Sequence, residues 1–232
     1  MGGELVPLTY QKERRFQEMK YSIKVNKLNN AEWSTKAFVS LTINDSFKIN
    51  DITIREAKNG NLFIAMPGYK TNQMDEQGNT VYKNYCYPTT AEFRQELFNK
   101  IMEAYKSEKE VVVNPDHKEV DYTINLFACN GSQKIESMAR IKFADCFAID
   151  GVKVVASDKG SFVAMPSKAK TGADGKTEYT DICYPVTKEF REQLYTKIIQ
   201  KNSNIKAQGN VDYEKSTDDI DQFAHDEGLP FR

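Results

Sequence analysis

The chain has 232 residues and a formal net charge of −1, and 40% of its residues are hydrophobic. This composition is typical of a globular protein, and no stretch approaches the ~20 consecutive apolar residues that a membrane-spanning helix needs. The sequence shows no signal peptide, and its four cysteines lack the spacing of a zinc site or a disulfide framework. We therefore expect a cytoplasmic protein that uses neither a cofactor nor a metal.

Residues 1–18 are a charged N-terminal extension to which we assign no function. Beyond it, apolar and polar residues alternate through 37–43, which is the period of a half-buried strand. A tight turn leads into a second strand, 47–57, with a β-bulge expected at Asn50 and Asp51 because the apolar register shifts there. A turn ending at Gly60 precedes a strand that runs into Ala-Met-Pro, and a long hairpin follows.

A helix is expected after Tyr87-Pro88, where Thr89 and Glu92 fit a capping box. Its apolar residues fall on one stripe, which indicates a helix packed on one face of the sheet. They are Phe93, Leu97, Phe98, Ile101 and Met102. A mostly polar linker, 107–119, comes next.

The same elements then return in the same order. Phe-Ile-Ala-Met-Pro at 63–67 becomes Phe-Val-Ala-Met-Pro at 162–166, and Cys-Tyr-Pro at 86–88 becomes Cys-Tyr-Pro at 183–185. The offset between copies is 100 residues up to Gly60 and Gly160, and 97 at the second motif. A repeat with such small insertions indicates a duplicated domain. We place the two domains at 19–106 and 120–201, followed by a disordered acidic tail, 202–232.

The predicted fold is α+β, with two repeated domains that are each an antiparallel β-meander with a C-terminal helix. Domains of this size hold only a modest core, and open sheet edges need cover. We expect the two copies to cover each other as an intramolecular pseudo-dimer, so that the chain is a monomer, with a higher oligomer as the alternative. Cys86 and Cys183, which are repeat equivalents, are predicted to be buried free thiols.

The second copy resembles the stage V sporulation protein G (SpoVG) family at residues 160–168 and 181–185. The first copy departs from the pattern at Gly68-Tyr69 and Asn84-Tyr85. The resemblance implies a small α+β domain that dimerises through its sheet and binds nucleic acid, often as a regulator. The family's binding residues, the basic ones after Ala-Met-Pro, would correspond to Lys168, Lys170 and Lys70.

The arginine of the family's Ser-Lys-Arg-Thr pattern is absent from both copies. Its absence argues against base-specific recognition of a duplex, in which an arginine would hydrogen-bond to the edge of a guanine. Lysines interleaved with tyrosines suit stacking on single strands instead. The predicted nucleic-acid-binding residues lie in the two hairpins and are Tyr69, Lys70, Lys83, Lys168, Lys170 and Lys176. Arg140 and Lys142, on a strand face, are second in line. The competing interpretation is that the hairpin lysines are only solvated.

The C-terminal tail differs from the remainder in charge. Residues 212–232 carry a net charge of −5, which leaves +4 for the remaining chain. The tip resembles the acidic C-terminus of single-stranded DNA-binding proteins, although Gly228 and Arg232 depart from it. That resemblance implies docking of Leu229, Pro230 and Phe231 on a replication or repair protein. We also expect the tail to compete with phosphates for the basic surface, most strongly at low salt.

An enzyme is disfavoured, because both histidines, His117 in the linker and His225 in the tail, lie outside the two copies. Three functions remain open. The first is single-stranded DNA binding in replication or recombination, in a bacterium or phage. The second is a sequence-selective regulator that binds double-stranded DNA or RNA. The third is a protein-interaction scaffold.

Overall fold

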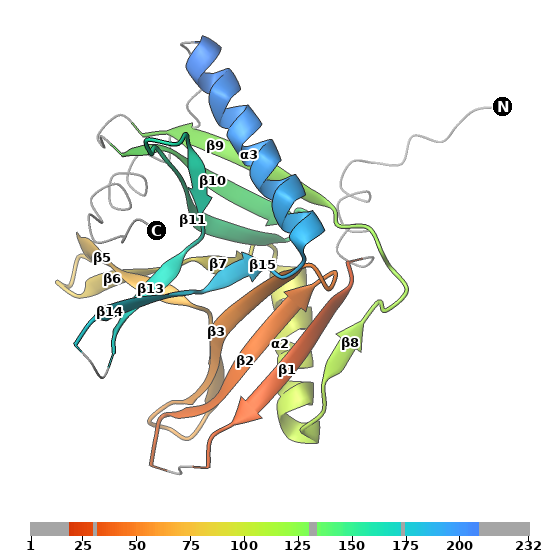
Figure 1. The fold of residues 1–232 in the computed structure, drawn as a ribbon. Helices are drawn as coiled ribbons and strands as arrows, with labels where there is room; N and C mark the ends of the chain where they lie inside the picture. The colour runs from red at the N-terminus through yellow and green to blue at the C-terminus, as the bar shows by residue number, and fades with distance from the viewer. Residues whose placement is uncertain (1–18, 30–31, 130–133, 173–174, 209–232) are drawn as a thin grey trace, which may run out of the picture.

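The computed structural model describes residues 19–29, 32–129, 134–172 and 175–208 (Figure 1). It is an α+β fold of two repeated units, each an antiparallel sheet followed by a helix, which confirms the predicted fold class. The first unit comprises β1 (Tyr21–Lys27), β2 (Thr35–Ile43), β3 (Phe47–Glu56), β4 (Leu62–Ala65), β5 (Gly68–Met74), β6 (Thr80–Asn84), β7 (Cys86–Pro88) and α2 (Ala91–Ser107).

The second unit repeats this order after a short connecting strand, β8 (Val111–Val113), which pairs with β1 inside the segment expected as a linker. Its elements are β9 (Tyr122–Ala128), β10 (Ile135–Phe143), β11 (Phe147–Val155), β12 (Phe162–Ala164), β13 (Ser167–Thr171), β14 (Thr177–Asp181), β15 (Cys183–Pro185) and α3 (Lys188–Gln208). The described helices include none that is long and apolar enough to cross a membrane.

Each unit gives its last short strand to the sheet of the other. β7 pairs with β11, so that Cys86 lies opposite Ile149, and β15 pairs with β3, so that Cys183 lies opposite Ile49. Backbone hydrogen bonds from Asn50 N to Ile182 O (2.8 Å) and from Asp150 N to Tyr85 O (2.7 Å) extend both pairings. The sister unit was expected to cover the sheet edge, and the structure shows that a donated strand does so.

The predicted bulges are present in both units. The register of β2 against β3 shifts between Val39 and Leu41, and that of β10 against β11 shifts between Ala139 and Ile141. Asp51 and Gly151 absorb the extra residue with positive φ angles of 62° and 78°. A bulge of this kind bends the strand, and here it does so beside the donated strands.

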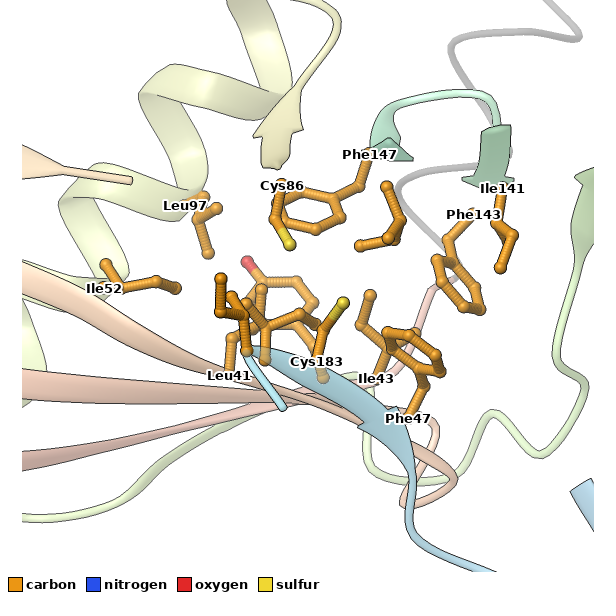
Figure 2. Packing of buried hydrophobic residues seen from close by; sticks show 14 of the residues in the cluster. Leu41, Ile43, Phe47, Ile52, Cys86, Leu97, Ile141, Phe143, Phe147 and Cys183 are labelled. Carbon is orange, nitrogen blue, oxygen red and sulfur yellow. The ribbon is translucent and has the colours of Figure 1, made fainter. Parts of the chain in front are cut away.

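A single apolar core runs through both units (Figure 2). Phe47 of the first unit lies 5.1 Å from Phe143 of the second, and Phe93 meets Phe147 edge to face at 6.3 Å. Cys86 and Cys183 are completely buried free thiols between the two sheets, as predicted, and burial raises the pKa of the Cys86 thiol. Because one core serves both units, neither has to be stable on its own modest core.

The helix boundaries correct two predictions. Thr90 is the N-cap of α2, and its side chain accepts a hydrogen bond from Phe93 N. Thr89, the expected cap, directly follows the exchanged strand β7 and extends its pairing, because its backbone N donates to Cys146 O at 2.7 Å. At the other end of the chain, α3 continues beyond residue 201 to Gln208, so residues 202–208 are not the start of a disordered tail.

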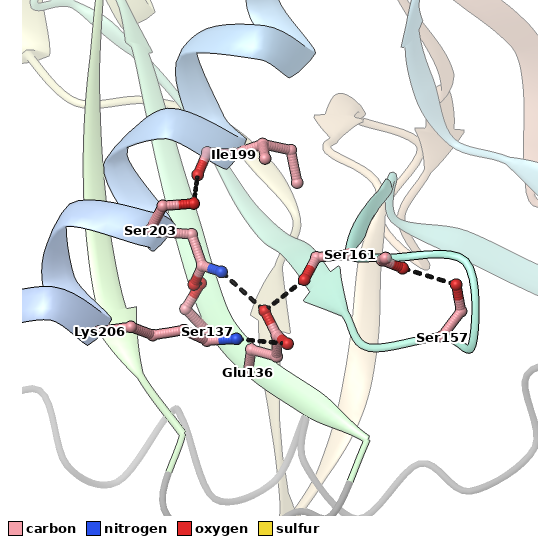
Figure 3. A network of polar contacts seen from close by, with 9 residues as sticks. Glu136, Ser137, Ser157, Ser161, Ile199, Ser203 and Lys206 are labelled. Carbon is pink, nitrogen blue, oxygen red and sulfur yellow. Dashed lines mark hydrogen bonds and ion pairs between the residues drawn. The ribbon is translucent and has the colours of Figure 1, made fainter.

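Polar contacts explain the longer helix (Figure 3). Asn202 is buried and donates from Nδ2 to Glu136 Oε2 at 2.7 Å, while Lys206 Nζ pairs with Glu136 Oε1 at 2.5 Å. Ser161 and Ser137 complete the network, donating to Glu136 and to Asn202 respectively. Burial opposes ionisation, but these hydrogen bonds outweigh it and hold the pKa of Glu136 below its ordinary value.

Candidate nucleic-acid interface

The first hairpin, β5–β6, separates its predicted site residues onto two faces. Tyr69 lies opposite Lys83, and Lys70 lies opposite Tyr82. Cross-strand partners share a face of a hairpin, and neighbours along a strand point to opposite faces. Tyr69 and Lys83 therefore share one face, and Lys70 and Tyr82 share the other.

The face with Tyr69 packs on the second unit. The Tyr69 ring lies 4.7 Å from that of Tyr85, and both pack against a small apolar cluster of Cys129, Ile135 and Met138. Burial, reinforced by Tyr85 and Asp150, raises the pKa of the Tyr69 hydroxyl. Tyr69 thus holds the hairpin in place, and the opposite face carries Tyr82, whose side chain is 69% exposed.

The second hairpin, β13–β14, brings Lys168 and Lys170 onto one face, opposite Thr180 and Glu178. Lys168 Nζ reaches across to the first unit and pairs with Asp51 Oδ2 at 2.5 Å, at the bulge of β3. Lys170 and Lys176 are exposed, and Lys176 directly precedes β14.

The two hairpins are related as the two units are. Gly68 pairs with Asn84 at the base of one, and Ser167 pairs with Asp181 at the base of the other, so Tyr69 and Lys168 are equivalent. Each reaches toward the opposite unit, and both hairpins project from the same side of the molecule (Figure 1). The structure therefore places the two sets of predicted residues on one side, although Tyr69 and Lys168 have structural partners.

Arg140, the second-line candidate, is engaged inside the fold. Its Nε donates to Asp150 Oδ1 at 2.5 Å and its Nη2 donates to Asp150 Oδ2 at 3.0 Å. Tyr87 also donates to this carboxylate at 2.8 Å, and burial together with Asp150 raises the pKa of Tyr87 to about 12. The predicted docking residues of the tail, Leu229, Pro230 and Phe231, lie outside the described residues.

Sequence reasoning missed the outer face of the first sheet, the face that points away from α2. Phe38 on β2 is 44% exposed and Phe63 on β4 is 45% exposed, with exposed Lys24 and Arg55 on the same face. The available signal was in β2, where an aromatic residue occupies the polar side of an alternating strand.

The sequence of this chain is similar to those of known bacterial proteins. The family model described as SpoVG matches residues 19–107 and 119–204. A SpoVG protein of Agathobacter rectalis is 40% identical over 81 residues, which are 35% of this chain and 85% of the relative. One of Finegoldia magna is 32% identical over 99 residues, or 42% of this chain and 88% of the relative. A SpoVG protein of Phytoplasma australiense is 33% identical over 76 residues, which are 33% of this chain and 75% of the relative.

The names of these relatives connect them with septation. Each alignment covers most of the relative but less than half of this chain, while the family model matches twice, once on each unit. The chain therefore belongs to the SpoVG family and carries the family's domain in tandem.

Proposed function

We propose that this chain binds single-stranded nucleic acid through its two hairpins. The observation that carries the proposal is the free face of β5–β6, where exposed Tyr82 lies opposite Lys70 in register. An aromatic ring beside a cation can stack on a base and neutralise its phosphate. Lys170 and Lys176 add exposed charge on the second hairpin, on the same side of the molecule (Figure 1).

Single strands fit this arrangement better than a duplex does. The rings of Tyr82 and of Tyr179 stand on short two-stranded hairpins, without an arginine beside them to read a guanine edge. Bases in a duplex are already stacked on each other, whereas bases in a single strand are free to stack on protein. The same proposal holds that the chain binds nucleic acid and does not catalyse a reaction.

The test compares labelled oligo-dT with a duplex of equal length by fluorescence anisotropy over a range of salt concentrations. Each phosphate contact contributes about 0.7 to the salt slope for a single strand. The variant with Lys70→Ala, Lys168→Ala and Lys170→Ala should lose up to about 2 from that slope. A control with Lys100→Ala, Lys109→Ala and Lys188→Ala removes the same charge from sites outside the hairpins and should keep most of the affinity.

Two results would contradict the proposal. The first is tighter binding of the duplex than of the single strand, which would favour a regulator of double-stranded DNA or RNA. The second is an absence of binding to any nucleic acid at low salt, which would favour a protein-interaction scaffold.

Three further expectations belong to this proposal. The strands exchanged within one chain support a monomer, to be checked by light scattering against 26.5 kDa. The buried free thiols support a reducing, cytoplasmic setting.

Contact with a replication or repair protein through Leu229, Pro230 and Phe231 should disappear in pull-downs with Phe231→Ala, and retention of every partner would contradict it.

A further inference from the structure

The outer face of the first sheet carries two aromatic rings that the core does not use. The inner face of β1–β3 packs on α2 through fully buried residues such as Leu41 and Ile52. The opposite face presents Phe38 and Phe63, which are 44% and 45% exposed. Rings of this size carry a large apolar surface, and exposed apolar residues gathered on one face can mark a binding surface.

The register places the rings on neighbouring parts of the same face. Phe38 pairs with Thr53, and Phe63 pairs with Arg55, two residues further along β3. Phe38 and Phe63 are on strands separated by β3 and are offset by two residues, so they lie about 12 Å apart at a strand spacing of ~4.8 Å and a rise of ~3.4 Å per residue. Thr53 lies opposite Phe38 and Arg55 lies opposite Phe63, so a small side chain adjoins one ring and a cation adjoins the other.

Charge on this face favours an anionic occupant. Lys24, Lys48 and Arg55 have no ion-pair partner within the part of the chain that the structure describes. The nearby acids are neutralised, because Asp51 pairs with Lys168 at 2.5 Å and Glu56 pairs with Lys36 at 2.7 Å. The face therefore combines unpaired cations with open rings.

The equivalent face of the second unit is covered at three of these positions. The positions that correspond to Phe38, Lys48 and Arg55 are Met138, Ala148 and Val155, which are 4%, 0% and 2% exposed. Tyr69 and Tyr85 pack against Met138 there. A surface with these properties exists once in the described molecule.

We propose that the outer face of the first sheet is a base-stacking platform for single-stranded nucleic acid, with Phe38 and Phe63 as the stacking rings and Lys24, Lys48 and Arg55 as phosphate contacts. This inference rests on the function proposed above and names a second surface for it. Lys168 joins the two surfaces, because it lies on the second hairpin and pairs with Asp51 at the edge of the platform.

The platform is tested with the full-length chain and oligo-dT, using Phe38→Ala and Phe63→Ala together. Loss of one stacked base costs roughly tenfold in affinity, so the double variant should bind about 100-fold more weakly with little change in salt slope. Phe162→Ala is the matched control, because Phe162 occupies the position of Phe63 in the second unit and is 38% exposed. It should bind as the unmodified chain does.

A second variant separates the platform from a folding defect. Phe38→Tyr with Phe63→Tyr keeps both rings and should retain binding, and Lys24→Ala with Arg55→Ala should lower the salt slope by about 1.4. If the unmodified chain binds and the Phe38→Ala, Phe63→Ala variant binds equally well, the platform is refuted while the proposed function stands. If the unmodified chain binds no nucleic acid, the proposed function itself fails.

Discussion

The outer faces of the two sheets show how far two copies of one domain can diverge within a shared fold. In the first unit, Phe38 and Arg55 are exposed, while in the second their equivalents Met138 and Val155 are buried. The inner faces differ little, because both contribute to one core in which Cys86 and Cys183 meet. The inner face of each unit is constrained by its partner, and the outer face is free to acquire a different use.

The C-terminal ends of the two helices also differ between the units. After α2 the chain turns at Glu108, which adopts a left-handed conformation with φ 56° and pairs with Lys27 at 2.6 Å. It then returns along β1 as β8. After the equivalent point, α3 continues, because Glu136 holds Asn202 and Lys206. The position of Glu136 is occupied by Lys36 in the first unit.

The largest contrast is expected between Met138→Ala and Phe38→Ala. Truncating the buried methionine should lower the free energy of unfolding by about 2–4 kcal/mol, because it leaves a cavity beneath Tyr69 and Tyr85. Truncating Phe38, which already faces water, should cost less than about 1 kcal/mol. Urea unfolding of the two variants measures both values, and equal losses would show that the outer faces are alike.

A smaller contrast is expected between Glu136→Ala and Lys36→Ala. Glu136 has a side chain that is only 14% exposed, and its loss leaves Asn202 without an acceptor, so we expect a cost of about 2–3 kcal/mol. Lys36 pairs with Glu56, which is more exposed than Glu136, and its loss should cost about 1 kcal/mol or less. Hydrogen exchange should rise at 202–208 in the first variant alone.

The same carboxylate gives α3 a dependence on pH. The pKa of Glu136 is lowered in the folded chain from its ordinary 4.5, so its stabilisation is complete above about pH 4.5 and is lost as the pH falls through the lower, folded value. Amide exchange at 202–208 should therefore accelerate in acid. In Glu136→Gln this acceleration should be reduced, and an unchanged acid response would assign the effect to another group.

Replacing Asp150 should affect Tyr87 of the donated strand β7, whereas the first unit carries Asn50 at the position equivalent to Asp150. Besides burial, the charge of Asp150 and its hydrogen bond raise the pKa of Tyr87 to about 12. Asp150→Asn should lower the pKa of Tyr87 toward the ordinary 10.0. Burial of the hydroxyl should still keep that pKa above the ordinary value. Titration followed by nuclear magnetic resonance, with Tyr87→Phe to assign the signal, measures the shift.

The smallest expected difference is between two lysines of the second hairpin. Lys170→Ala should reduce the salt slope of oligo-dT binding by about 0.7, as for one phosphate contact. Lys168→Ala should reduce it by less, because Asp51 already neutralises part of its charge. Equal reductions would mean that the Lys168–Asp51 pair opens when nucleic acid binds.

Much of each unit could be predicted from local sequence. The alternation of Ala37, Val39 and Leu41 placed β2, the register shift at Asn50 placed the bulge, and the repeated Cys-Tyr-Pro motif identified Cys86 and Cys183 as buried equivalents. These features depend on the spacing of apolar residues, every two or about every four positions, and on a duplication that can be seen by comparing the two halves of the sequence. Local patterning reports them because each residue's own neighbours decide its conformation.

The tertiary structure alone decided which unit receives each three-residue strand, where α3 ends, and which outer face stays open. β7 pairs with a strand some sixty residues away, as Cys86 opposite Ile149 shows, and its length carries no periodic signal. Alternation in β2 and β10 shows that one side of each strand is buried in the core, but it does not show what lies on the other side. Met138 is buried and Phe38 is exposed because a hairpin from the sister unit packs on one outer face, which is a contact between segments distant in the chain.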